Sequence, residues 1–192
     1  MSKTTESFRY LAELSTQLLS DQEFITQIET VAGKTAAAYR KGNKTIFCGN
    51  GGSAAEAQHL AAELSGRFNM ERSSIPAEAC HVNPSFVTAV SNDYNFTKVY
   101  ARYIDAFGMA GDVLFGLSTS GTSPNIVEAF KMAREKGLIT VAFTGKTGGE
   151  LNKWSDYIFK VPSEITPRIQ EIHLLIGHII CEQVEKELFG NA

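Results

Sequence analysis

The sequence lacks the features that mark several large protein classes. Its formal net charge is −3 and its isoelectric point is about 5.8, so it has no overall basic character for binding nucleic acid. No run of about eighteen apolar residues occurs, and residues 1–6 lack the apolar core of a signal peptide. The three cysteines, Cys48, Cys80 and Cys181, are far apart and form no C-x-x-C pair, which is typical of small apolar residues in a reducing compartment. We therefore expect a cytoplasmic protein with neither nucleic acid nor a membrane as partner.

Two nucleotide-binding motifs are present only in part. Residues 49–54 match the glycine spacing of the dinucleotide fingerprint, but the next strand lacks the required acid at its end, because Glu78 lies inside that strand. The P-loop lysine is missing from the same loop, and Gly145-Lys146-Thr147 lacks the earlier glycine of that motif. The sequence thus predicts no organic cofactor. We interpret the loop at 49–54 as one that lets the backbone approach a polar substrate closely.

Short apolar segments alternate with helical patterns along most of the chain. We expect strands at 45–48, 77–81, 113–117, 139–143 and 157–161, and helices at 54–64, 84–91, 96–108, 124–136 and 167–188. This alternation predicts an α/β fold, a three-layer parallel sheet of about five strands with helices on both faces. Because the crossovers are right-handed, the loops that follow the strands gather at one edge, where such sheets bind ligands.

Two further amphipathic helices precede the first strand. They are expected at about 6–20 and 21–41, and residues 1–42 are interpreted as a helical arm on a single domain that spans 1–192. Two such helices are more than a small sheet needs. Their apolar faces either pack on another subunit or simply cover the sheet, and the sequence alone does not decide between these alternatives.

The loop at 118–123 is rich in hydroxyl groups. Five of its six residues are Ser or Thr, and it lies between a buried strand and a helix that begins at Pro124. Backbone N–H groups at the start of a helix are unpaired and favour an anion, and hydroxyls add donors without adding charge. A phosphate monoester suits this loop. The alternative is a helix-capping loop that happens to contain many serines.

Polar side chains on two of the expected helices form a second group of candidates. His59 and Glu63 are four residues apart, so they share a helix face. Such a pair can bind a metal ion or act as an acid/base pair, and the alternative is a solvated helix surface. In the apolar last helix, Gln170 can share a site with His173 or with His178, but the two histidines lie roughly 140° apart and do not share one. The alternative for each histidine is a satisfied place in the core or in an interface.

The pair Asn92-Asp93 follows an expected helix. Asp93 could accept hydrogen bonds from sugar hydroxyls, and a capping or turn role fits equally well.

Several segments together resemble a known family. The chain is similar to sugar-isomerase (SIS) domain proteins and, among them, to the bacterial phosphoheptose isomerases, over essentially its whole length. The resemblance rests on residues 48–53, 59–67, 91–93, 111–114, 118–123, 133–137, 144–145 and 168–173, together with His178. It implies a flavodoxin-like SIS fold. The loop at 118–123 marks only the SIS class, whereas Glu63 with His178 is more specific, because replication-initiator-associating proteins of the same fold lack this acid and this histidine.

The resemblance also implies a role for individual residues. Glu63 would move a proton between C1 and C2 of a heptose phosphate, and His178 would act on the oxygens. The implied phosphate contacts are Ser118, Thr119, Ser120 and Ser123. The implied sugar contacts are Asn50, Gly51, Gly52, Asn92, Asp93 and Gln170. Zinc is implied at His59, Glu63, Gln170 and His178. At Thr166-Pro167 the sequence departs from the family pattern of a small residue and an acid, so no role carries over to that acid.

The implied reaction agrees with the residues. Interconversion of a ketose and an aldose through an enediol needs a carboxylate base, a proton donor for the oxygens and a remote anchor for the phosphate. The resemblance further implies conversion of sedoheptulose 7-phosphate to D-glycero-D-manno-heptose 7-phosphate for the lipopolysaccharide core, by a homotetramer with sites between subunits. The alternatives are an isomerase or a deacylating relative acting on a different phosphosugar, and a non-catalytic SIS protein that binds a phosphosugar or a replication initiator.

Overall fold

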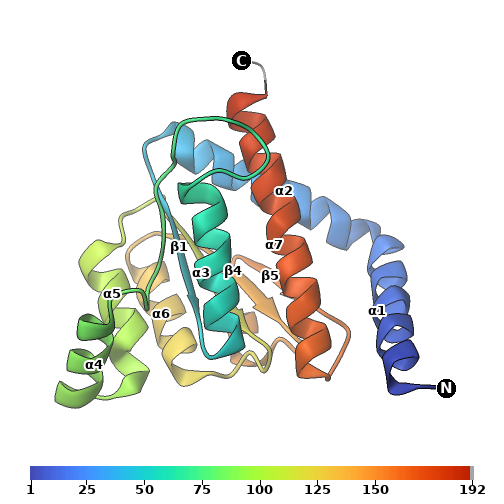
Figure 1. Cartoon of the computed structure of the whole chain (residues 1–192). Coiled ribbons are helices and arrows are strands. Elements are labelled where there is room, and N and C mark those ends of the chain that lie inside the picture. Colours follow the sequence, from blue (N-terminus) through green and yellow to red (C-terminus); the bar gives the residue numbers. More distant parts are fainter. Residues whose placement is uncertain (191–192) are drawn as a thin grey trace.

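The computed structural model describes residues 1–190 and contains a five-stranded parallel sheet of order β2-β1-β3-β4-β5 (Figure 1). The strands are β1 Thr45–Gly49, β2 Ala77–Ala79, β3 Val113–Ser118, β4 Ile139–Thr144 and β5 Tyr157–Lys160. The α-helices are α1 Lys3–Leu19, α2 Gln22–Arg40, α3 Gly52–Ser65, α4 Pro84–Asp93, α5 Val99–Phe107, α6 Pro124–Glu135 and α7 Thr166–Phe189. Two 3-10 helices, η1 Phe96–Lys98 and η2 Gly149–Lys153, complete the chain. The expected α/β architecture is confirmed.

The main departures from the expected element boundaries concern β2 and the helices between residues 84 and 108. Strand β2 ends at Ala79, because the chain turns there toward Asn83, whose side chain accepts a hydrogen bond from Phe86 N and caps α4. The helix expected at 96–108 is divided into η1 and α5, while α4 extends to Asp93. Within residues 1–190, none of the helices has the length and apolar character that crossing a membrane requires.

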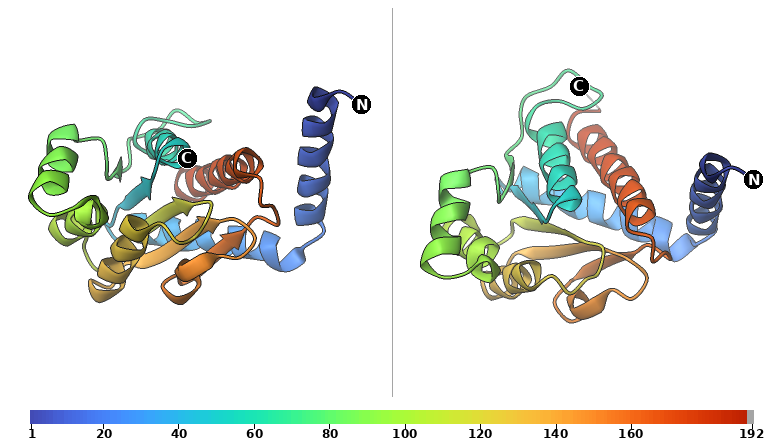
Figure 2. Two further views of the ribbon diagram at one scale, coloured as in Figure 1. Left: turned by 90° about the horizontal axis from the view of Figure 1, so that it is seen from below. Right: turned by 60° about the horizontal axis from the view of Figure 1, so that its bottom comes forward.

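The core lies on both faces of the sheet. Neighbouring strand residues point to opposite sides, so Phe47 packs with α2, α3 and α7, whereas Ile46 packs with α4, α5 and α6. Figure 2 shows these two helical layers above and below the strands. The stacked rings of Phe47 and Phe115, with centroids 4.9 Å apart, lie on the side of α3 and α7. This packing places α3 and α7 side by side over the sheet.

The two leading helices have different environments. Helix α2 packs on the sheet and on α7, with Ile28 and Val31 buried in the core. Helix α1 projects from the rest of the chain (Figure 1), and Phe8 and Leu19 are each 74% exposed. The first helix therefore keeps an uncovered apolar surface, whereas the second covers the sheet.

Candidate active site

The hydroxyl-rich loop lies at the carboxyl edge of the sheet, between β3 and α6. The Oγ atom of Ser118 is 3.0 Å from that of Ser123 and 3.5 Å from that of Ser120, so three hydroxyls converge. The side chain of Ser123, just before α6, makes no capping hydrogen bond, and the N–H groups of Ile126 and Val127 donate to the carbonyl of Ser123. Gly121 has φ +66°, and a Cβ there would lie 2.2 Å from the carbonyl of Gly148. The loop thus gathers the hydroxyl groups that an anion cradle would need, and its contact with a phosphate stays a prediction.

The loop after β1 is joined to this cradle through its side chains. Nδ2 of Asn50 donates to Oδ1 of Asn125 at 2.9 Å, and Nδ2 of Asn125 donates to Oδ1 of Asn50 at 2.8 Å. Asn125 lies in the first turn of α6. Gly51 has φ +55°, a conformation that favours glycine. Two helix N-termini, those of α3 and α6, therefore open onto the same edge with Asn50 between them.

A carboxylate and two imidazoles meet between α3 and α7. Nε2 of His59 lies 3.2 Å from Oε1 of Glu63 and 2.9 Å from Nε2 of His178. The ligand atoms of all three residues lie within 4.8 Å of one another. Burial, assisted by the adjacent His59, lowers the pKa of His178, although Glu63 acts in the opposite direction. An unprotonated imidazole is a metal ligand, and two imidazoles with one carboxylate form a donor set that zinc takes.

Gln170 lies apart from this group within one chain. Its Nε2 donates to Oγ of Ser53 at 3.4 Å, and it covers Gly52, where a Cβ would lie 2.5 Å from the amide nitrogen. Gln170 and His178 are eight positions apart, which corresponds to a rise of about 12 Å along α7. Gln170 is therefore placed for a ligand at the start of α3. Its role as a metal ligand stays a prediction.

The two histidines of α7 occupy separate environments, as their angular spacing predicts. His173 is fully buried, and its Nε2 donates to the carbonyl of Thr144 at 3.1 Å. Its role is to support the end of β4, while His178 faces α3.

Asn92 and Asp93 form the last turn of α4 and are exposed. Nδ2 of Asn92 donates to Oδ1 of Asp93 at 2.9 Å. Their proposed contact with a sugar stays a prediction.

Comparison with known proteins agrees with this geometry. Residues 8–145 match the SIS domain family. A phosphoheptose isomerase of Clostridium acetobutylicum is 49% identical over 179 residues, which cover 93% of this chain and 91% of that protein. The structure of a phosphoheptose isomerase from Neisseria gonorrhoeae aligns with a TM-score of 0.89 at 34% identity, over 96% of this chain and 97% of that one. One from Francisella tularensis aligns with a TM-score of 0.91 at 31% identity, over 97% and 100% of the two chains. The chain belongs to the phosphoheptose isomerase family.

The structure adds Glu56 to the candidate residues for a phosphoheptose isomerase reaction. It lies on α3 four residues after Gly52 and three before His59, between the two groups described above. Burial raises its pKa to about 7, although a hydrogen bond with Ser53 lowers it, and Oε2 has no hydrogen-bond partner among residues 1–190. A carboxyl group that titrates near neutral pH suits proton transfer. In the sequence, the spacing of Glu56 from His59 and Glu63 is the signal that could have indicated its role, but acids at this spacing are common on solvated helices.

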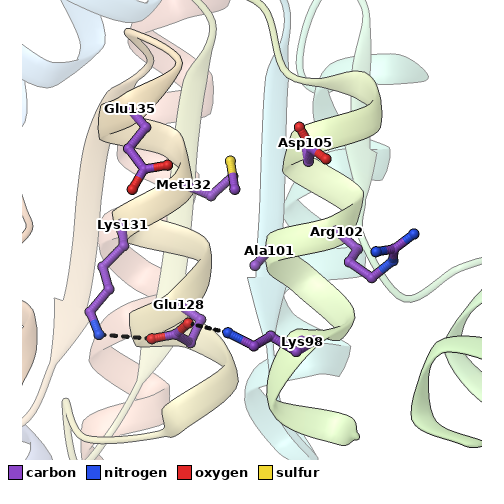
Figure 3. A pocket seen from close by; sticks show the side chains of 8 residues that line it. All are labelled: Lys98, Ala101, Arg102, Asp105, Glu128, Lys131, Met132 and Glu135. Atoms are coloured by element: carbon purple, nitrogen blue, oxygen red, sulfur yellow. Dashed lines mark hydrogen bonds and ion pairs between the residues drawn. The ribbon is translucent and has the colours of Figure 1, made fainter. Parts of the chain in front are cut away.

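A separate groove lies between α5 and α6 (Figure 3). Three of its charges are paired with one another, since Glu128 accepts from Nζ of Lys98 at 2.8 Å and from Nζ of Lys131 at 2.7 Å. These two lysines hold the pKa of Glu128 below its usual value. None of the residues proposed for the phosphoheptose isomerase reaction lines this groove.

The buried imidazole of His173 predicts an acid-sensitive fold. Burial lowers its pKa from the ordinary 6.5 to about 4, even though the carbonyl of Thr144 favours the charged form. Between these two pH values the unfolded chain binds a proton that the folded chain does not, so stability decreases as the pH falls. We expect His173→Gln to remove roughly 3 kcal/mol of the loss in unfolding free energy between pH 7 and pH 4. Urea unfolding at several pH values measures this difference, and parallel pH profiles of the two proteins would contradict it.

Proposed function

We propose that this protein converts sedoheptulose 7-phosphate to D-glycero-D-manno-heptose 7-phosphate, which supplies heptose for the lipopolysaccharide core. The observation that carries the proposal is the convergence of Glu63 with His59 and His178, in a chain that also has a hydroxyl cradle at the sheet edge. A non-catalytic SIS protein that binds a phosphosugar needs such a cradle, but neither it nor a protein that binds a replication initiator needs this carboxylate and these imidazoles.

The proposed reaction passes through an enediol. Glu63 removes a proton from C1 of the ketose and delivers a proton to C2, while His178 protonates O2 and accepts the proton of O1, so that C1 becomes the aldehyde carbon. The phosphate is anchored at the far end of the substrate by Ser118, Thr119, Ser120 and Ser123. The sugar hydroxyls contact Asn50, Gly51, Gly52, Asn92, Asp93 and Gln170.

We propose one zinc ion for each site. His59, Glu63 and His178 would hold it, because their donor atoms converge and the lowered pKa of His178 leaves a free lone pair. Zinc, when bound, polarises the carbonyl of the substrate. Gln170 would complete the ligand set from a neighbouring subunit, given its distance from His178 along α7.

The site is proposed to form between subunits. Gly52 begins α3 at the sheet edge, and Glu63 lies eleven residues further on, a rise of roughly 16 Å. An extended seven-carbon sugar phosphate spans only about 10 Å from C1 to phosphorus, by the dimensions of an extended chain. A substrate held at the cradle of one subunit would therefore reach Glu63 of a different subunit.

A homotetramer is the assembly that we propose. An apolar cavity of about 140 Å³ lies where α1 and α2 meet α7, and Leu175 on its lining is 46% exposed. Together with the exposed Phe8 and Leu19 of α1, this surface forms an uncovered apolar face on the single SIS domain that we propose for 1–192, with its helical arm at 1–42. Self-association would cover it. We place the protein in the cytoplasm, where sugar phosphates are found, and propose neither nucleic acid nor membrane as a partner.

Incubation of the protein with sedoheptulose 7-phosphate tests the proposed activity. We expect an aldoheptose 7-phosphate, detected by NMR or by chromatography against standards. Fructose 6-phosphate, offered in parallel, is expected to react much more slowly. Conversion of fructose 6-phosphate in preference to the heptulose would favour a different SIS isomerase, and binding without turnover of either would favour a sensor.

A further inference from the structure

The loop that leaves α3 is held by a buried ion pair. We call residues 66–72 the strap, because they arch from the end of α3 across α7 (Figure 1, green). Arg72 of the strap and Glu185 of α7 each have a side chain only 1% exposed, and Nε of Arg72 donates to Oε1 of Glu185 at 2.9 Å. Burying both charges is unfavourable unless their hydrogen-bonding groups are satisfied. The hydrogen bonds that the two side chains make show which part of the chain the ion pair holds in place.

The carboxylate of Glu185 binds the backbone of the strap. It accepts hydrogen bonds from the N–H groups of Phe68 at 3.1 Å, Asn69 at 2.7 Å and Met70 at 2.9 Å. Burial acts to raise the pKa of Glu185, but these three N–H groups and Arg72 together hold it below its usual value. Three consecutive N–H groups on one carboxylate fix the local path of the chain.

The guanidinium of Arg72 binds the other side of the strap. Nη1 donates to the carbonyls of Gly66 at 3.0 Å and Ser73 at 3.1 Å, and Nη2 donates to the carbonyl of Glu63 at 2.8 Å. The last of these contacts reaches the main chain of the proposed catalytic base. Arg72 therefore joins Glu185 to the turn of α3 that carries Glu63.

The fixed strap places Phe68 against His178. The two rings have centroids 5.6 Å apart and planes inclined by 26°, which is a stacked arrangement. The edge of His59 contacts the same imidazole, with centroids 5.1 Å apart and planes inclined by 65°. The ring of His178 is thus held between a stacked Phe68 and the edge of His59.

We propose that Arg72 and Glu185 are positioning residues for a metal site. They fix the strap so that Phe68 orients His178, and Arg72 also holds the turn of α3 that carries Glu63. The inference rests on the proposed metal role of the site. Neither residue contacts the ligand atoms of His59, Glu63 or His178, so their effect on a bound ion would act through the strap. Groups that orient ligands in this way typically change metal affinity by 10- to 100-fold.

The test measures Zn²⁺ affinity by competition with a chromophoric chelator. We expect Arg72→Lys, which keeps the charge but loses the fork of donors, to weaken Zn²⁺ binding by about tenfold or more. Phe68→Leu, which leaves the ion pair intact, should weaken it about threefold, the scale of one aromatic contact. Phe68→Tyr should keep the wild-type affinity for Zn²⁺, because the stacked ring is retained.

Asp112→Asn is the matched control for loss of stability. Asp112 is also 1% exposed and accepts from Nζ of Lys44 at 2.6 Å and from the N–H groups of Lys44 and Met109, but it lies at the amino end of β3. The substitution Asp112→Asn should lower the unfolding temperature and leave Zn²⁺ affinity unchanged.

The outcomes separate this inference from the proposed function. Unchanged Zn²⁺ affinity in folded Arg72→Lys and Phe68→Leu, or an equal loss in Asp112→Asn, would overturn the positioning role. A wild-type protein that binds no Zn²⁺ would overturn both the metal role and this inference. If the affinities change as expected but sedoheptulose 7-phosphate is not converted, the inference stands and the proposed activity fails.

Discussion

Glu63→Gln should lower kcat for the conversion of sedoheptulose 7-phosphate by at least about a hundredfold, the scale of general base catalysis. Glutamine preserves the size of the side chain and can still accept from His59, but it cannot take a proton from C1. Because Glu63 is also a proposed zinc ligand, the variant should bind Zn²⁺ more weakly as well. Steady-state kinetics with the purified variant, saturated with substrate, measures the effect.

Glu182→Gln supplies the matched control, since Glu182 is an exposed acid on α7. It should retain the kcat of the wild-type protein. A kcat for Glu63→Gln close to that of this control would remove Glu63 from the mechanism, and a large loss in both variants would point to a general effect of charge.

Two inactive variants, assembled together, should regain activity if each site is shared between subunits. Glu63→Gln removes the base, and Ser120→Asp introduces a negative charge that repels the phosphate at the cradle. In a randomly mixed oligomer each site takes its base and its cradle from different chains, so about one quarter of the sites should be intact. We expect the mixed assembly to recover roughly that fraction of wild-type kcat.

The variants would be coexpressed with two different affinity tags and purified over both. Each variant alone should remain nearly inactive. A chain that carries both substitutions, when mixed with the wild-type chain, should add no activity to that of the wild-type sites that remain. No recovery in the doubly purified oligomer would indicate that base and cradle come from one chain, against the helix distances between Gly52 and Glu63.

The sequence predicted those features that follow from short-range patterns. The alternation of strands and helices led to the parallel sheet, and the four-residue spacing of His59 and Glu63 led to their shared face on α3. The angular spacing on the last helix separated His173 from His178, as the structure confirms. These inferences needed only the geometry of one element at a time.

The contacts between distant elements were not predictable in the same way. His59 and His178 are 119 residues apart, and their distance of 2.9 Å depends on how α3 packs against α7. The ion pair of Arg72 with Glu185 carries no local signal, because charges at these positions are equally common on a solvated loop and helix. The resemblance to a family supplied the pairing of Glu63 with His178, but it did not reveal the strap that holds them.

The most direct test of the enediol mechanism is the isomerisation of sedoheptulose 7-phosphate in D₂O, followed by NMR of the product. The side chain of Glu63 is 22% exposed, so a proton taken from C1 can exchange with solvent before delivery to C2. We predict deuterium at C2 of the aldoheptose phosphate made by the wild-type protein, and none accumulating with Glu63→Gln over the same period. Deuterium incorporation by Glu63→Gln at the rate of the wild-type protein would contradict proton transfer by Glu63.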